Sequence, residues 1–367
     1  MKNIIKIIAI NIIIFFALIG ILVFVPILTY QTYSYFKSSK IPPKKFYDYP
    51  NKEFSKEIVN LKFTYSDFTT IKTNQFNGKA ININNDGNRV TKISKNVILN
   101  SPSYIFLGSS MIWGYGDEDG NTIPSIFSQF NNVYIDNFAE VAYTTKQSLG
   151  KLITYYSENK LSNNKRVIIF AVGDIDFATN CSDDEEIFKS SHTKKLQKII
   201  ESSFNVKYNE YLDFKLIFEP TLLFFKKLVN KPQSNNIGIK ECSKKKLNFI
   251  SDTMIKNLSI ANQIAKYNGD NFFAVLSPVS YEDDIDVTNY NTQKDKDIIK
   301  FNAKNGYEII RKKIKENSEF NFIDLSKIFT NNSDVYYDPS HYSLKGKKIY
   351  VEELTKEINN LKKLENR

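Results

Sequence analysis

Five short apolar runs, each bounded by turn residues, constrain the fold of this 367-residue chain more than any other feature. Segments of helical length separate most of them. Buried strands that alternate with helices are typical of a parallel sheet covered on both faces, with the functional site beyond the carboxyl ends of the strands. We therefore predict an α/β fold of three layers, α/β/α, around a mostly parallel five-stranded sheet. The runs are Tyr104–Leu107, Val133–Asn137, Val167–Val172, Phe272–Leu276 and Phe320–Asp324.

The rest of the chain falls into further parts. A stretch with three prolines among lysines and aromatic residues suits an extended stalk. The alternation of strands and helices is interrupted between the third and the fourth run, which indicates an insertion. We expect a membrane anchor in residues 1–30, a stalk and N-terminal extension in 31–98, the α/β domain in 99–177 and 250–367, and the insertion in 178–249.

Two cysteines, Cys181 and Cys242, are the only ones in the chain, and both lie near the ends of the insertion. In an oxidising compartment they are well placed to form a disulfide that closes the insertion at its base. Two unrelated buried thiols are the alternative interpretation. The sequence leaves both open.

The run Ile7–Leu28 holds 22 residues without a charge, enough for a helix to cross about 30 Å of hydrocarbon. A cleavable signal peptide is the alternative, but its apolar region is about 7–15 residues long, and no Ala-x-Ala-like cleavage site is present. We therefore expect an uncleaved, single-pass anchor. Charge does not favour an exported C-terminus, because Lys2 and Lys6 precede the run while four lysines follow it between residues 37 and 45.

The formal net charge of +10 raises the question of nucleic acid binding. However, only four of the 50 basic residues are arginines, and arginine supplies the bidentate contacts on which base readout depends. We expect no nucleic acid partner. The sequence also lacks a Cys and His cluster with metal-ligand spacing and a glycine-rich phosphate motif, so we expect no metal and no cofactor.

The stretch "FLGSSMIWGYG", from Phe106 to Gly116, ends the first apolar run at a glycine and two serines. A simple turn could use Asn-Gly or Asp-Gly, so paired serines at the end of a buried strand indicate chemistry. Ser110 is the candidate nucleophile. A helix N-cap formed by the serine pair is the alternative that this stretch alone leaves open.

The stretch "YYDPSHYSLKGKK" near the C-terminus places Asp338 three residues before His341. A carboxylate at this spacing can hold the imidazole in one tautomer, and a histidine held in this way is the general base that a serine nucleophile needs. The chain has just one other histidine, His192. It lies among polar residues inside the insertion, and we expect it to be a solvated surface residue.

Together these stretches resemble the SGNH or GDSL-type serine hydrolases, in particular the membrane-anchored members associated with bacterial cell-surface polysaccharides. "FLGSSMIWGYGDEDGNTIPSIF" is similar to the family's first block, with Ser109 at the aspartate position and Ser110 as the nucleophile. "DPSHYSLKGKK" resembles its last block, which implies Asp338 as the orienting carboxylate and His341 as the base. "ININNDGNRVTK" and "DNFAEVAYTTKQ" are similar to the segment before the first strand and to the second block.

The resemblance also implies an oxyanion hole at Ser110, Ala142 and Asp174. In the family its donors are the N–H of the nucleophile, a glycine N–H of the second block and an asparagine side chain of the third. Ala142 replaces the glycine and keeps its N–H. Asp174 stands near the asparagine position, where an ionised carboxylate can only accept. Either Asn180 reaches back as a donor or Asp174 has a structural role, and the sequence does not decide between them.

The function implied by the resemblance is that of a serine esterase or O-acyltransferase. It would act through an acyl-serine on acyl groups, in particular O-acetyl groups, of a cell-envelope glycan. The expected partners are an acylated glycan or a small ester, the membrane through the N-terminal helix, and a membrane-bound acyltransferase. We expect the catalytic domain outside the cytoplasm. The alternative is a catalytically degenerate member that binds a glycan or serves as an assembly component in polysaccharide modification.

Overall fold

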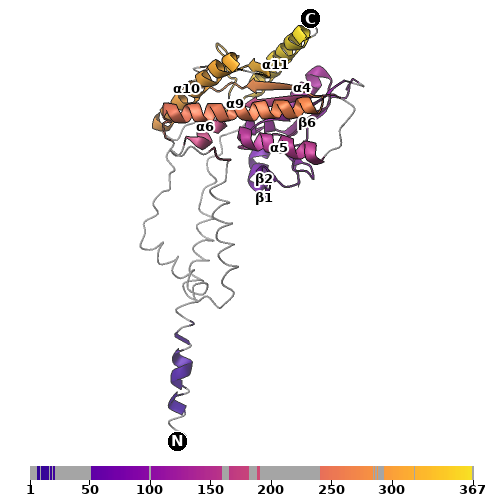
Figure 1. Ribbon diagram of the computed structural model, residues 1–367. Helices are drawn as coiled ribbons and strands as arrows, with labels where there is room; N and C mark the ends of the chain where they lie inside the picture. Colours follow the sequence, from indigo (N-terminus) through magenta and orange to yellow (C-terminus); the bar gives the residue numbers. More distant parts are fainter. Residues whose placement is uncertain are drawn as a thin grey trace. The chain divides into compact units, whose positions relative to one another are not determined.

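The computed structural model describes residues 6–8, 10–15, 17–18, 20, 51–98, 101–158, 165–181, 188–190, 240–283, 285, 287, 293–317 and 319–365. Most of them belong to one compact unit formed by Tyr47–Thr193 and Ile239–Arg367, shown in colour in Figure 1. His192 and most of the predicted anchor lie outside the described residues. Among the described helices, none is both long enough and apolar enough to span a membrane.

A five-stranded sheet forms the middle layer, and every neighbouring pair of strands is parallel. Each predicted apolar run supplies one strand. The second of these strands along the chain begins later than predicted, because the N–H of Val133 donates to the oxygen of Ser128 in the preceding helix (3.3 Å). In sheet order the strands are β6 (Ile135–Asn137), β5 (Ser103–Leu107), β7 (Arg166–Val172), β8 (Asn271–Leu276) and β9 (Asn321–Asp324).

Helices cover both faces of the sheet, which gives the predicted three layers. Alternate residues of the central strand β7 face opposite layers, as the period of a strand requires. Ile169 joins the core beneath α4 and α11, and Ile168 joins the core beneath α5, α9 and α10. Figure 1 shows the long helix α9 beside α5. The helices are α4 (Ile123–Asn131), α5 (Thr145–Glu158), α9 (Lys244–Tyr267), α10 (Gln293–Asn317) and α11 (Leu344–Glu365).

The N-terminal extension packs onto the same core as α4 and α11. Phe54, Ile81 and Ile83 are buried in that core together with residues of the sheet. The extension is built of short elements, each too small to fold alone, so its structure depends on this packing. They are α2 (Lys52–Glu57), η1 (Ile58–Asn60), the hairpin β1 (Phe63–Ser66) with β2 (Thr70–Thr73), and the pair β3 (Phe76–Asn77) with β4 (Asn82–Ile83).

Arg89 links the extension to the loop that follows the first long strand. Its buried guanidinium donates to the carboxylate of Asp119 (3.1 Å) and to the carbonyl oxygens of Gly114 and Asp117. It also lies 4.4 Å from the centroid of the Trp113 ring. A planar donor fork is suited to bonding several acceptors at once. The segment from Trp113 to Asp119 is therefore fixed by a residue outside the α/β domain.

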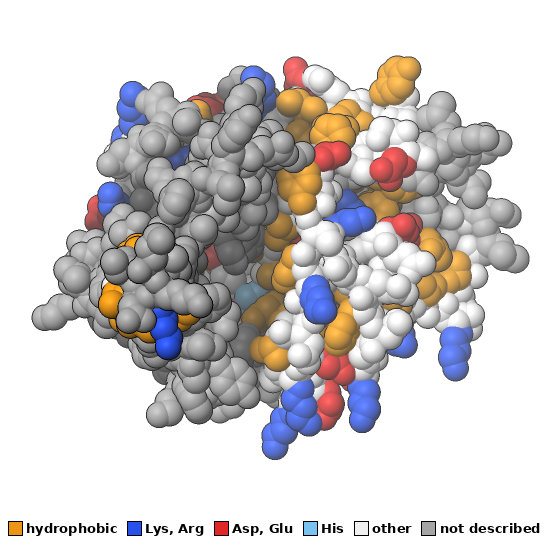
Figure 2. All heavy atoms as spheres, turned by 90° about the horizontal axis from the view of Figure 1, so that it is seen from below, with side chains coloured by type: hydrophobic (Ala, Val, Ile, Leu, Met, Phe, Trp, Pro, Cys, Tyr) orange, Lys and Arg blue, Asp and Glu red, His pale blue; other side chains and the backbone are white. Residues whose placement is uncertain are grey.

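The hairpin β1–β2 exposes three aromatic side chains, Phe63, Tyr65 and Phe68, at 47%, 58% and 59% of their area. Figure 2 shows that on the face seen from below hydrophobic side chains lie among polar and charged ones. Scattered apolar groups are ordinary on protein surfaces. We assign no role to this hairpin.

Cys181 and Cys242 are joined by a disulfide. Cys181 follows the short helix α6 (Ile175–Asn180), and Cys242 lies just before α9. The backbone N–H of Cys242 donates to Oδ1 of Asn302 on α10 (2.8 Å). The disulfide closes the insertion at its base, and most of the insertion between the two cysteines lies outside the described residues.

Candidate active site

Ser110 lies at the carboxyl end of β5, as the first residue of the short helix α3 (Ser110–Trp113). Gly108 makes this turn possible, because a Cβ there would lie 3.0 Å from both the oxygen of Ala171 and Cγ1 of Ile112. Ser109 occupies the N-cap position of α3, but its side chain makes no capping hydrogen bond. The serine pair therefore does not act as a side-chain helix cap.

Ser110, His341 and Asp338 meet in one hydrogen-bonded chain. The Ser110 hydroxyl lies 2.8 Å from Nε2 of His341. On the other side of the ring, Nδ1 lies 2.8 and 2.7 Å from the two carboxylate oxygens of Asp338. The imidazole is 16% exposed and the carboxylate 5%. This arrangement leaves Nε2 free to accept the serine proton, because Asp338 fixes the other ring nitrogen as a donor.

Hydrogen bonds to backbone groups hold the loop that carries His341. The N–H groups of Ser340 and His341 both donate to Oδ1 of Asp338 (2.9 and 3.0 Å). The N–H of Tyr337 donates to the oxygen of His341 (2.8 Å), and Ser280 donates to the oxygen of Pro339 (2.9 Å). The acid and the base therefore form one local unit, as their spacing predicts.

Three carboxylates act on the pKa of His341. Burial by itself lowers that pKa, but Asp338, Asp174 and Asp117 outweigh the burial and raise the pKa above its ordinary value. The Tyr115 ring lies against the imidazole, with 5.0 Å between the ring centroids. These carboxylates thus stabilise the protonated form of His341, the candidate base.

The loop between β6 and α5 lies beside the nucleophile turn. The N–H of Phe138 donates to the carbonyl oxygen of Phe106 (2.8 Å), and the N–H of Glu140 donates to the carbonyl oxygen of Gly108 (3.3 Å). Within this loop Ala142 has a φ of 62°, the left-handed region that favours glycine. Within the described ranges, the N–H groups of Ser110 and Ala142 donate to no protein acceptor. Both N–H groups remain available to an oxyanion.

Glu140 ties this loop to the N-terminal extension. Its Oε2 accepts hydrogen bonds from the N–H and the hydroxyl of Thr73 (3.0 and 2.6 Å), and its Oε1 accepts from the N–H of Val141 (2.8 Å). Burial raises the pKa of Glu140. The extension thus contacts both loops next to Ser110, through the bonds of Thr73 to Glu140 and through Arg89.

Asp174 takes a structural role and Asn180 does not approach the site. Oδ2 of Asp174 accepts a hydrogen bond from the hydroxyl of Ser340 (2.7 Å), and burial raises the pKa of this carboxyl. Asn180 instead bonds to the backbone of Lys189 and of Asp176. Both the nitrogen and the oxygen of the Asn180 amide are thus engaged with backbone groups.

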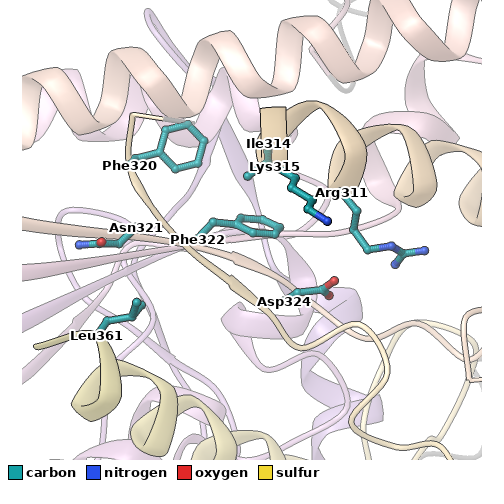
Figure 3. Close-up of a pocket in the computed structure, with 8 residues that line it drawn as sticks. All are labelled: Arg311, Ile314, Lys315, Phe320, Asn321, Phe322, Asp324 and Leu361. Atoms are coloured by element: carbon teal, nitrogen blue, oxygen red, sulfur yellow. The ribbon is translucent and has the colours of Figure 1, made fainter. Parts of the chain in front are cut away.

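Two cavities lie outside this cluster. One, of about 610 Å³, is bordered by α2, the segment Gly116–Asn121 and Tyr337. The other, of about 430 Å³, lies at the edge strand β9 between α10 and α11, where Figure 3 shows the ring of Phe322 beside the side chain of Lys315. Neither cavity is lined by Ser110, Asp338 or His341. In the described ranges, no group of three His, Cys, Asp or Glu side chains could hold a metal ion.

Sequence reasoning missed Glu140, Arg89 and Ser340 as neighbours of the site. Ser340 carries a signal, since it lies between Asp338 and His341 in the chain. Arg89 carries a weaker one, because it is one of only four arginines. Glu140 has no sequence signal, since its partner Thr73 is 67 residues away.

This chain is similar to known proteins in structure, and the two sequence comparisons found no match. No protein-family model matches the sequence, and no curated protein matches it. The chain is similar to a GDSL-like lipase from Bacteroides thetaiotaomicron at 12% identity, over 72% of this chain and 92% of that one, with a TM-score of 0.39. It is also similar to phospholipase A1 from Streptomyces albidoflavus at 12% identity and to an extracellular lipase from Streptomyces rimosus at 11% identity. Each match covers 70% of this chain and 99% of the other, with a TM-score of 0.39.

Proposed function

We propose that this protein is a serine esterase or O-acyltransferase of the SGNH type. The observation that carries the proposal is the chain of hydrogen bonds from Ser110 through His341 to Asp338. Nucleophile, base and orienting acid come from two loops at the carboxyl edge of one parallel sheet, where sites of such folds lie. A serine so arranged is suited to attack an acyl carbon.

In the first half of the reaction, the Ser110 oxygen forms a bond to the carbonyl carbon of an ester while its proton passes to Nε2 of His341. The carbonyl electron pair moves onto the oxygen, which the N–H groups of Ser110 and Ala142 stabilise. The intermediate then collapses. Its bond to the alcohol oxygen breaks, the alcohol takes the proton from Nε2, and the acyl group remains on Ser110.

In the second half, water or a sugar hydroxyl attacks the acyl-serine, and its proton passes to Nε2 of His341. Collapse of the second intermediate breaks the bond to Ser110, which recovers the proton from Nε2. The result is hydrolysis when water attacks and transfer when a sugar hydroxyl attacks. Asp338 stays ionised throughout and stabilises the imidazolium.

The natural substrate in this proposal is an O-acetylated glycan of the cell envelope. Three features support it: the resemblance of the motif blocks to anchored members of the family, the apolar run Ile7–Leu28, and the disulfide between Cys181 and Cys242, which suits an oxidising compartment. We propose that the run anchors the protein by a single pass, with the catalytic domain outside the cytoplasm and a membrane-bound acyltransferase as partner.

The test uses the full chain in detergent micelles. A fluorophosphonate probe and para-nitrophenyl acetate are applied to the wild type and to Ser110→Ala and His341→Ala. Ser109→Ala is the matched control, because Ser109 is a neighbouring serine whose side chain makes no capping bond. We expect labelling and turnover in the wild type and the control, and a loss of turnover of about 10⁴–10⁶-fold in the other two.

A folded wild type that neither reacts with the probe nor turns over the ester would contradict catalysis. That result would favour the alternative function, a degenerate protein that binds a glycan. One observation supports this alternative, namely that Asp174 has replaced the asparagine donor and bonds to Ser340. Mass spectrometry of a disaccharide added with the ester separates transfer from hydrolysis.

A further inference from the structure

The 610 Å³ cavity is lined by neighbours of His341, the base of the proposed reaction. Its walls include Gly116 and Asp117, which follow Tyr115 in the chain, and the Tyr115 ring packs on the imidazole of His341. The wall formed by Tyr337 is joined to His341 by a backbone hydrogen bond of 2.8 Å. Asp117 is also close enough to raise the pKa of His341. The cavity therefore lies on the histidine side of the site.

Most residues that line this cavity carry a polar or charged group, and their aliphatic stems line it together with those groups. They present carboxylates, amides, an ammonium group and a tyrosine ring, and only Leu344 is aliphatic. An acyl chain that filled this cavity would remove water from these charged groups, which costs free energy. A molecule rich in hydroxyl groups can bond to these walls instead. The polar lining residues are Asn51, Lys52, Glu53, Asp117, Glu118 and Asn121.

Several residues that line the cavity are bonded to neighbouring groups. Asp117 forms a buried ion pair with Lys347 of α11, and the Lys347 ammonium lies 5.3 Å from the centroid of the Tyr337 ring. The backbone of Asp117 is held in turn by Arg89. Asn121 is fixed to Glu118 by a hydrogen bond of 3.2 Å. Preformed sites of about 300–1,000 Å³ with a few fixed polar groups are typical of small-molecule binding.

The chemistry of the reaction assigns an occupant to this side. His341 returns its proton to the alcohol oxygen as the first intermediate collapses, and it removes the proton of an attacking hydroxyl in the second step. Both alcohols must therefore lie on the histidine side of Ser110. The acyl group lies on the other side, where its oxygen meets the N–H groups of Ser110 and Ala142.

We propose that this cavity is the subsite for the sugar that carries, or accepts, the acyl group. The inference rests on the proposed function for the reacting atoms, and it adds the position and the residues of sugar recognition. A pyranose there would bond to the side chains of Lys52 and Asn121, and one ester oxygen would reach towards Nε2 of His341. The N-terminal extension thus contributes to the choice of substrate, since α2 supplies one wall.

The experiment compares two esters and one binding reaction on the full chain in detergent micelles. The esters are mono-O-acetylated di-N-acetylchitobiose and para-nitrophenyl acetate. The nitrophenyl group of the second ester has no free hydroxyl group that could bond to the cavity walls. The variants are Lys52→Ala/Asn121→Ala and Asn121→Trp, which fills the cavity. Lys315→Ala is the matched control, because it removes a lysine from the cavity at β9. Binding of unacetylated di-N-acetylchitobiose is followed by saturation-transfer NMR.

We expect the ratio of kcat/KM for the sugar ester to kcat/KM for the small ester to fall at least 10-fold in both cavity variants and to stay within 2-fold in Lys315→Ala. An unchanged ratio in the cavity variants, with both esters turned over, would overturn the inference and leave the proposed function intact. If the wild type turns over neither ester, the proposed function fails. In that case disaccharide binding that both cavity variants abolish supports the subsite, and no binding overturns it.

Discussion

Asp174, at the end of β7, accepts a hydrogen bond of 2.7 Å from the hydroxyl of Ser340, the residue before the candidate base His341. A second carboxylate is thereby placed behind the imidazole, in addition to that of Asp338. Its negative charge helps to raise the pKa of His341. Asp174, predicted from the sequence to lie at the oxyanion hole, instead bonds to the loop that carries the candidate base.

This relationship predicts the pH dependence of turnover. His341 must be neutral to accept a proton, so kcat/KM for para-nitrophenyl acetate should rise with pH, with a midpoint above the ordinary pKa of 6.5. Asp174→Asn removes one negative charge and should lower the midpoint. The control Asp252→Asn removes an exposed carboxylate on α9 and should leave it in place. An identical midpoint in the wild type and Asp174→Asn would contradict this role of Asp174.

Ala142 predicts an effect of backbone strain. A left-handed conformation costs an L-residue about 1–2 kcal/mol, and glycine avoids this cost. Glycine in turn destabilises the fold by about 0.4–1 kcal/mol, because it increases the entropy of the unfolded chain. Ala142→Gly should therefore stabilise the fold by about 0.5–1 kcal/mol and keep the N–H and the activity. Ala142→Val should destabilise it, because a β-branched residue tolerates this conformation less well. Chemical unfolding of both variants tests the sign, and a destabilised Ala142→Gly would show that the φ of 62° is not strained.

Asp176 predicts a loss of stability at high pH. Burial raises the pKa of this carboxyl to about 7, although it accepts bonds from the N–H and the hydroxyl of Thr145 (3.0 and 2.9 Å). A raised pKa stabilises the fold fully below pH 3.8, and this contribution is lost as pH rises through about 7. Between pH 5 and pH 8 the loss is about 2–3 kcal/mol.

Asp176→Asn should remove this dependence. Its amide can accept from Thr145 through oxygen, and its nitrogen would replace Oδ2, which has no hydrogen-bond partner among the described residues. We expect Tm of the variant to exceed that of the wild type more at pH 8 than at pH 5. Equal differences at the two pH values would place the titration elsewhere.

Arg89 predicts coupling between the extension and the nucleophile loop. Arg89→Met leaves the carboxylate of Asp119 buried without its cation, and loss of one partner of a buried pair costs about 3–5 kcal/mol. Arg89→Lys keeps the charge but loses the fork, so it should recover only part of the stability. Full recovery by lysine, measured by urea unfolding, would show that charge alone matters.

The disulfide predicts a dependence of stability on redox conditions. Cys181 and Cys242 are 61 residues apart, and closing a loop of this size contributes about 4 kcal/mol in the chain-entropy model. Cys181→Ser/Cys242→Ser should lower Tm, and a reductant should lower Tm of the wild type but not of the double variant. A wild type insensitive to a reductant, with free thiols on titration, would contradict the bond.

The sequence by itself determined the features that depend on near neighbours. Apolar runs between turn residues predict all five strands, because burial on both faces requires continuous apolar stretches. The spacing of Asp338 and His341 predicts their pairing, because one turn brings them together. The start of β6 is the exception, because the N–H of Val133 bonds to the end of α4. The apolar character of Val133 does not reveal this bond.

Only the tertiary structure decided the contacts between distant parts of the chain. Ser110 and His341 are 231 residues apart, and they meet because parallel strands bring their carboxyl ends to one edge. The left-handed backbone of Ala142, the bond from Ser340 to Asp174 and the bonds of Thr73 to Glu140 arise from how loops pack against one another. Such contacts depend on the geometry of the whole domain, whereas a sequence pattern records only the local preference of each segment.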